Sequence, residues 1–185
     1  MSSQMAAPSL VVFDLDECMW SPETFELKGP FEKAADGRVL DTEGVELKLY
    51  PGALRALQQV HSDMPATRVA VASAGRFADW ARGAMHMFEV VSGVTFADMV
   101  AFCEIHPCET DAGKAVHFED IRAASGVPFD QMVFWDDCTW GDNCADVRRG
   151  CPGVVTCKTP HGMTDETWAA GLAEFAASSK ADAGR

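Results

Sequence analysis

The chain has 185 residues, of which 48% are hydrophobic, and its formal net charge at pH 7 is −13. This length suits one compact domain rather than two. The acidic balance argues against a nucleic-acid surface, which needs clustered Lys and Arg, and against adsorption to anionic membranes. We therefore expect neither a nucleic acid nor a membrane as a partner.

The sequence carries no sign of export. It has no run of eighteen apolar residues, and residues 1–9 are small and polar, without the basic and long apolar regions of a secretory signal. We expect these nine residues to form a disordered N-terminal tail. The seven Cys are odd in number and scattered, which suits reduced thiols packed as small hydrophobes. We predict a cytoplasmic monomer.

The apolar run 10–13 predicts a strand buried on both faces of a parallel sheet. Asp14 and Asp16 follow at its carboxyl end, the edge where α/β sheets bind ligands. Two carboxylates this close repel each other, and a cation or a proton must offset the repulsion. Mg²⁺ suits the pair, because it prefers oxygen ligands and is usually held by one or two carboxylates, water and phosphate. Alone, the pair is a weak signal, since solvated turns also contain such pairs.

Residues 21–49 form an insertion directly after the acidic pair. Its turn signals predict a hairpin of 31–35 against 39–41, followed by an extended piece over 45–50. Long segments of this kind are uncommon unless they serve a site. We interpret the insertion as a flap over the two Asp residues, with a decorative surface hairpin as the alternative.

The rest of the chain alternates helices with strands. The predicted strands are 69–72, 100–105, 131–135 and 154–157; the predicted helices are one from Pro51, 77–88, one from Lys114 to about Ser125, a short one ending near Gly150, and one from about Thr164. Such alternation predicts parallel βαβ units. Small and charged residues predict a C-terminal tail over 178–185, which leaves 10–177 as one domain.

Polar residues follow several of these strands. Ser73 follows the second strand, Asp136 and Asp137 end the fourth, and Lys114 opens a helix. Because the carboxyl ends of parallel strands share an edge, we expect these groups to meet Asp14 and Asp16. A carboxylate nucleophile, a bound cation, a Lys and a hydroxyl suit phosphoryl transfer.

The order of these residues resembles the four motifs of the haloacid dehalogenase (HAD) superfamily of aspartate-nucleophile phosphatases. Further segments resemble the magnesium-dependent phosphatase-1 family: Phe13-Asp14-Leu15-Asp16 followed by Trp20, Leu49-Tyr50-Pro51, Lys114 with His117-Phe118, and Gly126 through to Asp136-Asp137. The resemblance covers roughly residues 10–175. It implies an α/β fold, a HAD-like Rossmannoid three-layer sandwich around a central parallel sheet, with only the flap and no large cap domain.

The resemblance also implies roles for the matching residues. Asp14 would attack phosphorus and form an aspartyl-phosphate, and Asp16 would protonate the leaving oxygen and then activate water. Ser73, Ala74 and Lys114 would bind the phosphoryl group.

Mg²⁺ is the implied cofactor. Its implied ligands are Asp14, Asp16 through its main-chain carbonyl, and Asp137, with Asp136 in support.

The implied substrates are phosphotyrosine proteins or peptides, or sugar phosphates such as fructosamine phosphates. The close family has an Arg after the Ser, whereas this chain has Ala74 there and Arg76 two positions later. Arg76 and Trp20 are therefore candidate substrate contacts. We expect Trp135 in the core and leave Trp140 open. Cys18 stands where the superfamily has Thr or Val, and we expect it to pack there.

Two other readings compete with the phosphatase. A zinc site could use His106 with Cys103 and Cys108, or Cys138, Cys144, Cys151 and Cys157. Neither set has the tight Cys pairs of structural zinc sites, so packing thiols are favoured. The other alternative is a non-catalytic phosphate- or phosphoprotein-binding module, although binding alone does not need a nucleophile beside an acid.

Overall fold

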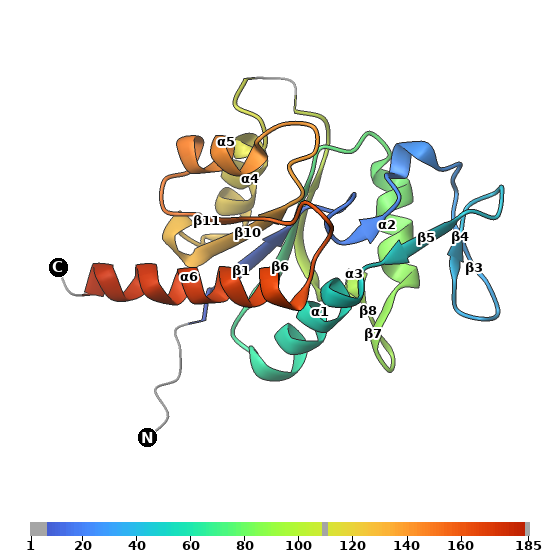
Figure 1. Cartoon of the computed structure of the whole chain (residues 1–185), viewed down its shortest axis with the longest axis horizontal. Coiled ribbons are helices and arrows are strands. Elements are labelled where there is room, and N and C mark those ends of the chain that lie inside the picture. The colour runs from blue at the N-terminus through green and yellow to red at the C-terminus, as the bar shows by residue number, and fades with distance from the viewer. Residues whose placement is uncertain (1–6, 109–110, 184–185) are drawn as a thin grey trace.

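A five-stranded sheet forms the centre of the computed structural model, which describes residues 7–108 and 111–183 (Figure 1). Its strands, in the order β11-β10-β1-β6-β9, are β1 (Leu10–Phe13), β6 (Arg68–Ser73), β9 (Val100–Ile105), β10 (Met132–Asp136) and β11 (Val155–Lys158). All neighbouring strands run parallel. The chain extends the sheet from β1 through β6 to β9, then returns to add β10 and β11 on the other side. The strand order therefore reverses between β1 and β10, where open α/β sheets bind ligands.

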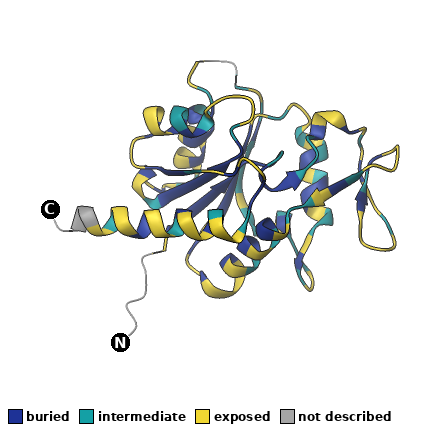
Figure 2. Ribbon diagram, viewed as in Figure 1, coloured by how far each residue is buried: buried dark blue, intermediate teal, exposed yellow. Residues whose placement is uncertain are grey.

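Helices cover both faces of this sheet. They are α1 (Pro51–Asp63), α2 (Ala78–Met87), α3 (Phe96–Met99), α4 (Ala115–Ser125), α5 (Asn143–Gly150) and α6 (Asp165–Ala183), with short 3-10 turns at Thr24–Glu26 and Phe129–Gln131. Alternation along β1 sends Val11 and Phe13 into a core with α1, α2 and α6, and sends Leu10 and Val12 into a second core with α4 and α5. Figure 2 shows the resulting buried central layer. The predicted three-layer α/β sandwich is confirmed.

The insertion after β1 folds as a separate antiparallel sheet of four short strands. In the order β2-β5-β4-β3, these are β2 (Trp20–Ser21), β5 (Glu46–Leu49), β4 (Val39–Leu40) and β3 (Glu32–Lys33). The predicted hairpin is present, with shorter strands than expected. Phe31 is buried and meets Trp80 of α2 edge-on, with ring centroids 6.3 Å apart. The flap is therefore packed against the main domain beside α2 (Figure 1).

The segment between α2 and β9 contains elements that we did not predict. A hairpin of β7 (Glu89–Val91) and β8 (Val94–Thr95) turns at Gly93, whose φ of 78° suits glycine. Helix α3 follows, and Thr95 and Asp98 form its capping box. Gly93 and the Thr-x-x-Asp pattern were the sequence signals for these elements.

The predicted C-terminal tail begins too early, because α6 continues to Ala183. The hydroxyls of Ser178 and Ser179 donate to carbonyls one turn back, at 3.1 and 3.0 Å, so these polar side chains form their hydrogen bonds within the helix. At the N-terminus, residues 1–6 of the predicted tail lie outside the described residues. The carbonyl of Ser9 accepts a hydrogen bond from the amide of Arg68 at 3.0 Å, so this end of the tail is joined to β6.

Among the described residues, no helix is both long enough and apolar enough to cross a bilayer.

Candidate active site

The turn after β1 presents both carboxylates of the first motif. Asp14 continues the strand, and its amide donates to the carbonyl of Trp135 on β10 at 2.9 Å. After Asp16 the chain reverses around the carbonyl of Leu15, which accepts bonds from three successive amides. Glu17 has a φ of 53°, in the left-handed region that permits this sharp turn. The second Asp is thereby directed back toward the end of the sheet.

Lys114 lies between two buried carboxylates. Its Nζ is 2.5 Å from Asp14 Oδ1 and 2.6 Å from Asp136 Oδ2, and its side chain is 2% exposed. Burial lowers the pKa of this ammonium, but the two carboxylates raise it more, so its pKa is raised overall and it stays charged. The three groups meet because α4 begins beside the ends of β1 and β10.

Asp136 and Asp137 differ in how many hydrogen bonds their carboxylate oxygens accept. Asp136 is fully buried and also accepts hydrogen bonds from Asn143 Nδ2 at 3.0 and 3.2 Å and from the amide of Cys138 at 2.8 Å. Burial raises the pKa of Asp136, but Lys114 and Asn143 lower it more, and the net direction is downward. Asp137 Oδ2 accepts only the amide of Thr139 among the hydrogen bonds of the described residues, at 2.8 Å. Of the two carboxylates, Asp137 therefore has more oxygen lone pairs free to bind a metal ion.

The carboxylates of Asp14, Asp136 and Asp137 form a set that suits a hard cation. One oxygen of each lies within 4.8 Å of the other two, and all three residues are buried. Lys114 supplies one positive charge against three negative ones. An oxygen-only donor set with excess negative charge fits Mg²⁺.

Asp16 is held by two side chains of the flap. Its Oδ1 accepts hydrogen bonds from Trp20 Nε1 at 2.7 Å and from Thr24 Oγ1. Burial raises the pKa of this carboxyl, although both donors oppose the shift. The two hydrogen bonds thus fix one oxygen of Asp16, while burial favours the protonated form more than water does.

The prediction that Trp20 contacts substrate is wrong. Its side chain is fully buried, and its ring packs against Phe88 and Phe96. The indole N–H is used by Asp16, so Trp20 can position the acid but offers no face to a ligand. Trp135 lies in the core as expected.

Two adjoining cavities open at this edge of the sheet. One, of about 360 Å³, is lined by Asp14, Asp16 and Asp137 together with Lys114 and Ser73. The other, of about 420 Å³, is lined by Phe25 and Phe77 of the flap and of the loop before α2. Ala74 and Arg76 line both cavities. The predicted phosphate-binding residues therefore lie together, with Arg76 at the boundary between the two spaces.

Trp140, which we left open, connects the flap to the loop after Asp137. Its Nε1 donates to Glu23 Oε1 at 2.5 Å, and its ring meets Phe25 edge-on with centroids 6.1 Å apart. The side chain remains 77% exposed. It therefore forms part of the rim of the site.

The cysteine-containing zinc sets are not assembled among the described residues. The two groups with metal-binding geometry there contain no Cys. Cys108 Sγ lies 3.7 Å from His117 Nδ1, while Cys103 packs against the core of α1, α2 and α6. Cys18 is buried with its thiol directed at the carbonyl of Trp135, so it packs as expected.

Thr24 and Asn143 are site residues that sequence reasoning missed. Thr24 lies in an irregular part of the flap, where no periodicity predicts its direction. Asn143 stands at the first position of α5, next to Asp142, which caps that helix through the amide of Ala145. The cap was a readable signal for the start of the helix, but the contact of Asn143 with Asp136 depends on the tertiary fold.

Solved structures share this fold. The chain matches a HAD-superfamily hydrolase of Ehrlichia chaffeensis with a TM-score of 0.60 at 9% identity, covering 93% of this chain and 98% of that one. It also matches the N-terminal phosphatase-containing part of BF1531 from Bacteroides fragilis, solved with Mg, with a TM-score of 0.58 at 18% identity, covering 93% of this chain and 40% of that one. The chain therefore shares its α/β fold with hydrolases of the HAD superfamily.

Comparisons with other sequences identify the family of the chain. The family model described as Acid Phosphatase matches residues 6–178. Human magnesium-dependent phosphatase 1 is 33% identical over 171 residues, covering 91% of this chain and 88% of that protein. A HAD-like hydrolase superfamily protein of Schizosaccharomyces pombe is 27% identical over 134 residues, covering 70% and 76%. The chain belongs to the acid phosphatase family.

Proposed function

We propose that the chain is a magnesium-dependent phosphomonoesterase that works through an aspartyl-phosphate on Asp14. The observation that carries the proposal is the placing of Asp14 beside Lys114, at 2.5 Å, with a second acid, Asp16, two residues further on and held by Trp20 and Thr24. A site that only binds phosphate needs a cation, but it needs neither a nucleophile nor an acid positioned beside it.

Mg²⁺ would be held by the carboxylates of Asp14 and Asp137 and the main-chain carbonyl of Asp16, with Asp136 in support. When bound, it would neutralise charge on the phosphoryl oxygens and on the carboxylates. Burial raises the pKa of Asp14, and a cation at these oxygens would lower it again, which keeps the nucleophile ionised. The name of the human relative and the Mg bound to the Bacteroides structure support this cofactor.

In the first half of the reaction, a carboxylate oxygen of Asp14 attacks phosphorus and the bond from phosphorus to the leaving oxygen breaks. Asp16 donates its proton to that oxygen. Both side-chain donors to Asp16 bond the same atom, Oδ1, so the transferable proton belongs on Oδ2. Lys114, Ser73 and the main-chain amide of Ala74 bind the oxygens of the transferring group, and Lys114 also restrains the Asp14 carboxylate.

In the second half, the ionised Asp16 takes a proton from a water molecule that attacks the phosphorus of the aspartyl-phosphate. The products are inorganic phosphate and the regenerated Asp14 carboxylate. A pKa raised by burial suits both roles, since a catalytic acid and base works best with a pKa near the operating pH.

The residues at the rim of the site indicate which classes of substrate fit. The cavity lined by Phe25 and Phe77 has aromatic walls and the exposed guanidinium of Arg76. It has room for a phosphotyrosine side chain or a sugar such as a fructosamine, and the flap leaves it accessible. We propose these two substrate classes, for a monomer acting in the cytoplasm.

Metal-dependent turnover is the test of this function. We expect phosphate release from a small aryl phosphate, phosphotyrosine peptides or sugar phosphates with Mg²⁺, and loss of that release with excess chelator. Restoring Mg²⁺ should restore activity, which controls for damage by the chelator. A folded chain that binds Mg²⁺ and releases no phosphate from any of these substrates would instead indicate the non-catalytic binding module.

The Trp20→Phe substitution tests whether Trp20 positions and tunes Asp16. Removing a hydrogen bond to the ionised carboxyl raises its pKa further, by about one unit, because a hydrogen bond to a charged group contributes about 1.5 kcal/mol or more. The alkaline limb of the kcat/KM profile, which needs protonated Asp16, should therefore move to higher pH. Trp168→Phe, which removes an indole bond to Gln59, is the matched control. An unmoved limb in the Trp20 variant would contradict the role given to Trp20.

A further inference from the structure

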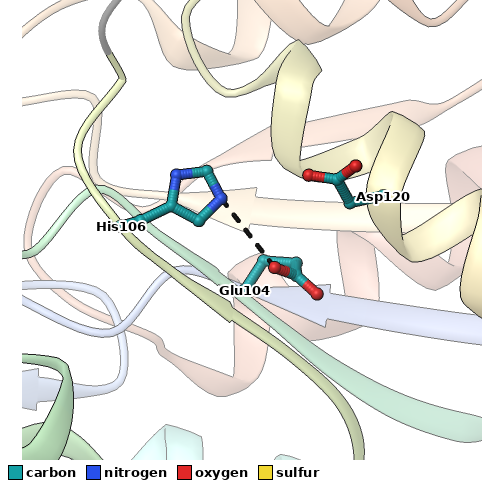
Figure 3. Close-up of side chains that lie close together, drawn as sticks. All are labelled: Glu104, His106 and Asp120. Carbon is teal, nitrogen blue, oxygen red and sulfur yellow. Dashed lines mark ion pairs between the residues drawn. The ribbon is translucent and has the colours of Figure 1, made fainter.

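A second group of metal-ligating side chains lies outside the active site, at the carboxyl end of β9 and on α4. Figure 3 shows Glu104, His106 and Asp120 lying close together, and one ligand atom of each is within 4.8 Å of the other two. We propose that these three side chains bind a transition-metal ion of the zinc class. This site is separate from the proposed phosphatase reaction and does not depend on it.

Strand alternation explains why these residues share one side of the sheet. Phe102 packs with the core of α4 and α5, whereas Cys103 packs with the opposite core. Glu104, two residues after Phe102, therefore faces α4. On α4, Asp120 lies three residues after His117 and so on the same side of the helix. The two elements thus present a carboxylate each to the same space.

His106 is held between them in an orientation that suits a metal ligand. Its ring stacks on the ring of His117, with centroids 4.1 Å apart. His117 is fully buried and donates from Nε2 to the main-chain carbonyl of His106 at 2.9 Å, which joins α4 to the end of β9. This support fixes where the His106 ring lies before any ion binds.

The hydrogen bonding of the His106 ring also suits a metal ligand. Its Nδ1 lies 3.3 Å from the carbonyl oxygen of Pro107, which can only accept, so Nδ1 carries the proton. Nε2 is directed toward Glu104, whose Oε2 is 3.8 Å away, and is the ring nitrogen left for a metal ion. Metal-binding His side chains typically donate their other N–H to a carbonyl or carboxylate in this manner.

The charge around the group calls for a cation. Over residues 7–108 and 111–183, Glu104 has an ion pair only with His106, and Asp120 has none. Two carboxylate side chains therefore lie beside a single imidazole, and neither is paired with a Lys or Arg in that part of the chain. A nitrogen donor among the ligands favours Zn²⁺ over Mg²⁺, which prefers oxygen donors alone. The active-site set of three carboxylates has the opposite preference.

The three ligand atoms need to move only a little to reach the distances of a zinc site. Zinc bonds of about 2.0–2.2 Å in a tetrahedral site place ligand atoms about 3.3 Å apart. The 3.8 Å between Nε2 and Oε2 is close to this value. Asp120 is exposed and Glu104 and His106 are partly exposed, so rotation of the two carboxylates can close the site and solvent can complete the coordination.

Calorimetric titration of the full chain with Zn²⁺, in excess Mg²⁺ that occupies the active-site carboxylates, tests the proposal. We expect one zinc ion per chain, and His106→Ala and Asp120→Asn should each weaken binding at least about tenfold. His86→Ala, at another exposed His, is the matched control and should bind as the unchanged chain does. Asp137→Asn should also retain zinc, because it changes only the active-site set.

No zinc binding by the unchanged chain, or undiminished binding by His106→Ala, would overturn the proposal. Loss of zinc in Asp137→Asn would assign the ion to the active site and overturn it as well. Replacing the His106 side chain leaves its main-chain bonds in place, including that from its amide to Ser73, so the variant should fold. Should it unfold in circular dichroism, the exposed Asp120→Asn variant provides the same test alone.

Discussion

Asp14→Asn should lower kcat by at least about 10³-fold, the scale seen when a catalytic nucleophile is removed. An amide cannot attack phosphorus, and nothing else in the site replaces it. Phosphate release under saturating Mg²⁺ and substrate measures the loss. The fold should persist, because the substitution keeps the size of the side chain and Lys114 retains its contact with Asp136 at 2.6 Å.

Asp79→Asn, at an exposed position in the first turn of α2, is the matched control and should keep full activity. Both variants should show the circular dichroism spectrum of the unchanged chain. Activity of Asp14→Asn within tenfold of the unchanged chain would exclude Asp14 as the nucleophile.

Lys114→Met should destabilise the fold by about 3–5 kcal/mol, the cost of removing one partner from a buried ion pair. It leaves Asp14 and Asp136 buried, close together and without a cation, in a domain whose total stability is of the order of 5–15 kcal/mol. The substitution should also abolish turnover. Equilibrium unfolding in urea at neutral pH, without added metal, measures the change.

The control is Lys158→Met, which breaks an ion pair of similar length, 2.6 Å to Asp142, on the exposed surface. Solvent screens that pair, so the expected change in stability is small. Adding Asp14→Asn to Lys114→Met should recover part of the lost stability, because one of the two uncompensated charges is removed. Equal unfolding curves for the two Lys variants would contradict the burial argument.

The parts of the fold that sequence predicted well are those with strong local patterns. The short apolar run at 10–13 indicated a buried strand, and parallel strands bring their following residues to one edge, so Asp14 and Asp136 were expected together. The short hairpin of β7 and β8 lacks such a run, and its only signal was Gly93. Helix α6 extends past Ser178 because the small and charged residues that suggested a tail include Ala and Lys, which favour helix.

The charged residues of the candidate site were predictable for the same reason. The roles of the residues that hold them in place were not. Charged side chains at strand ends reveal themselves by type and position. Trp20 has both an apolar body and a polar tip, so its sequence position fits a substrate platform as well as a buried donor to Asp16. Only the packing of the flap distinguishes the two. Asn143 likewise acquires its role from the place where α5 begins beside β10.

Acid quenching followed by peptide mapping detects the proposed aspartyl-phosphate on Asp14. Asp16→Asn should be mixed with Mg²⁺ and an aryl phosphate, since this leaving group departs readily without an acid while the base that activates water is missing. We expect one added phosphoryl mass on the peptide containing Asp14, and no added mass when Asp14→Asn is combined with Asp16→Asn. Turnover by the unchanged chain, with no phosphorylated peptide in Asp16→Asn or with the phosphoryl group on another residue, would exclude Asp14 as the nucleophile.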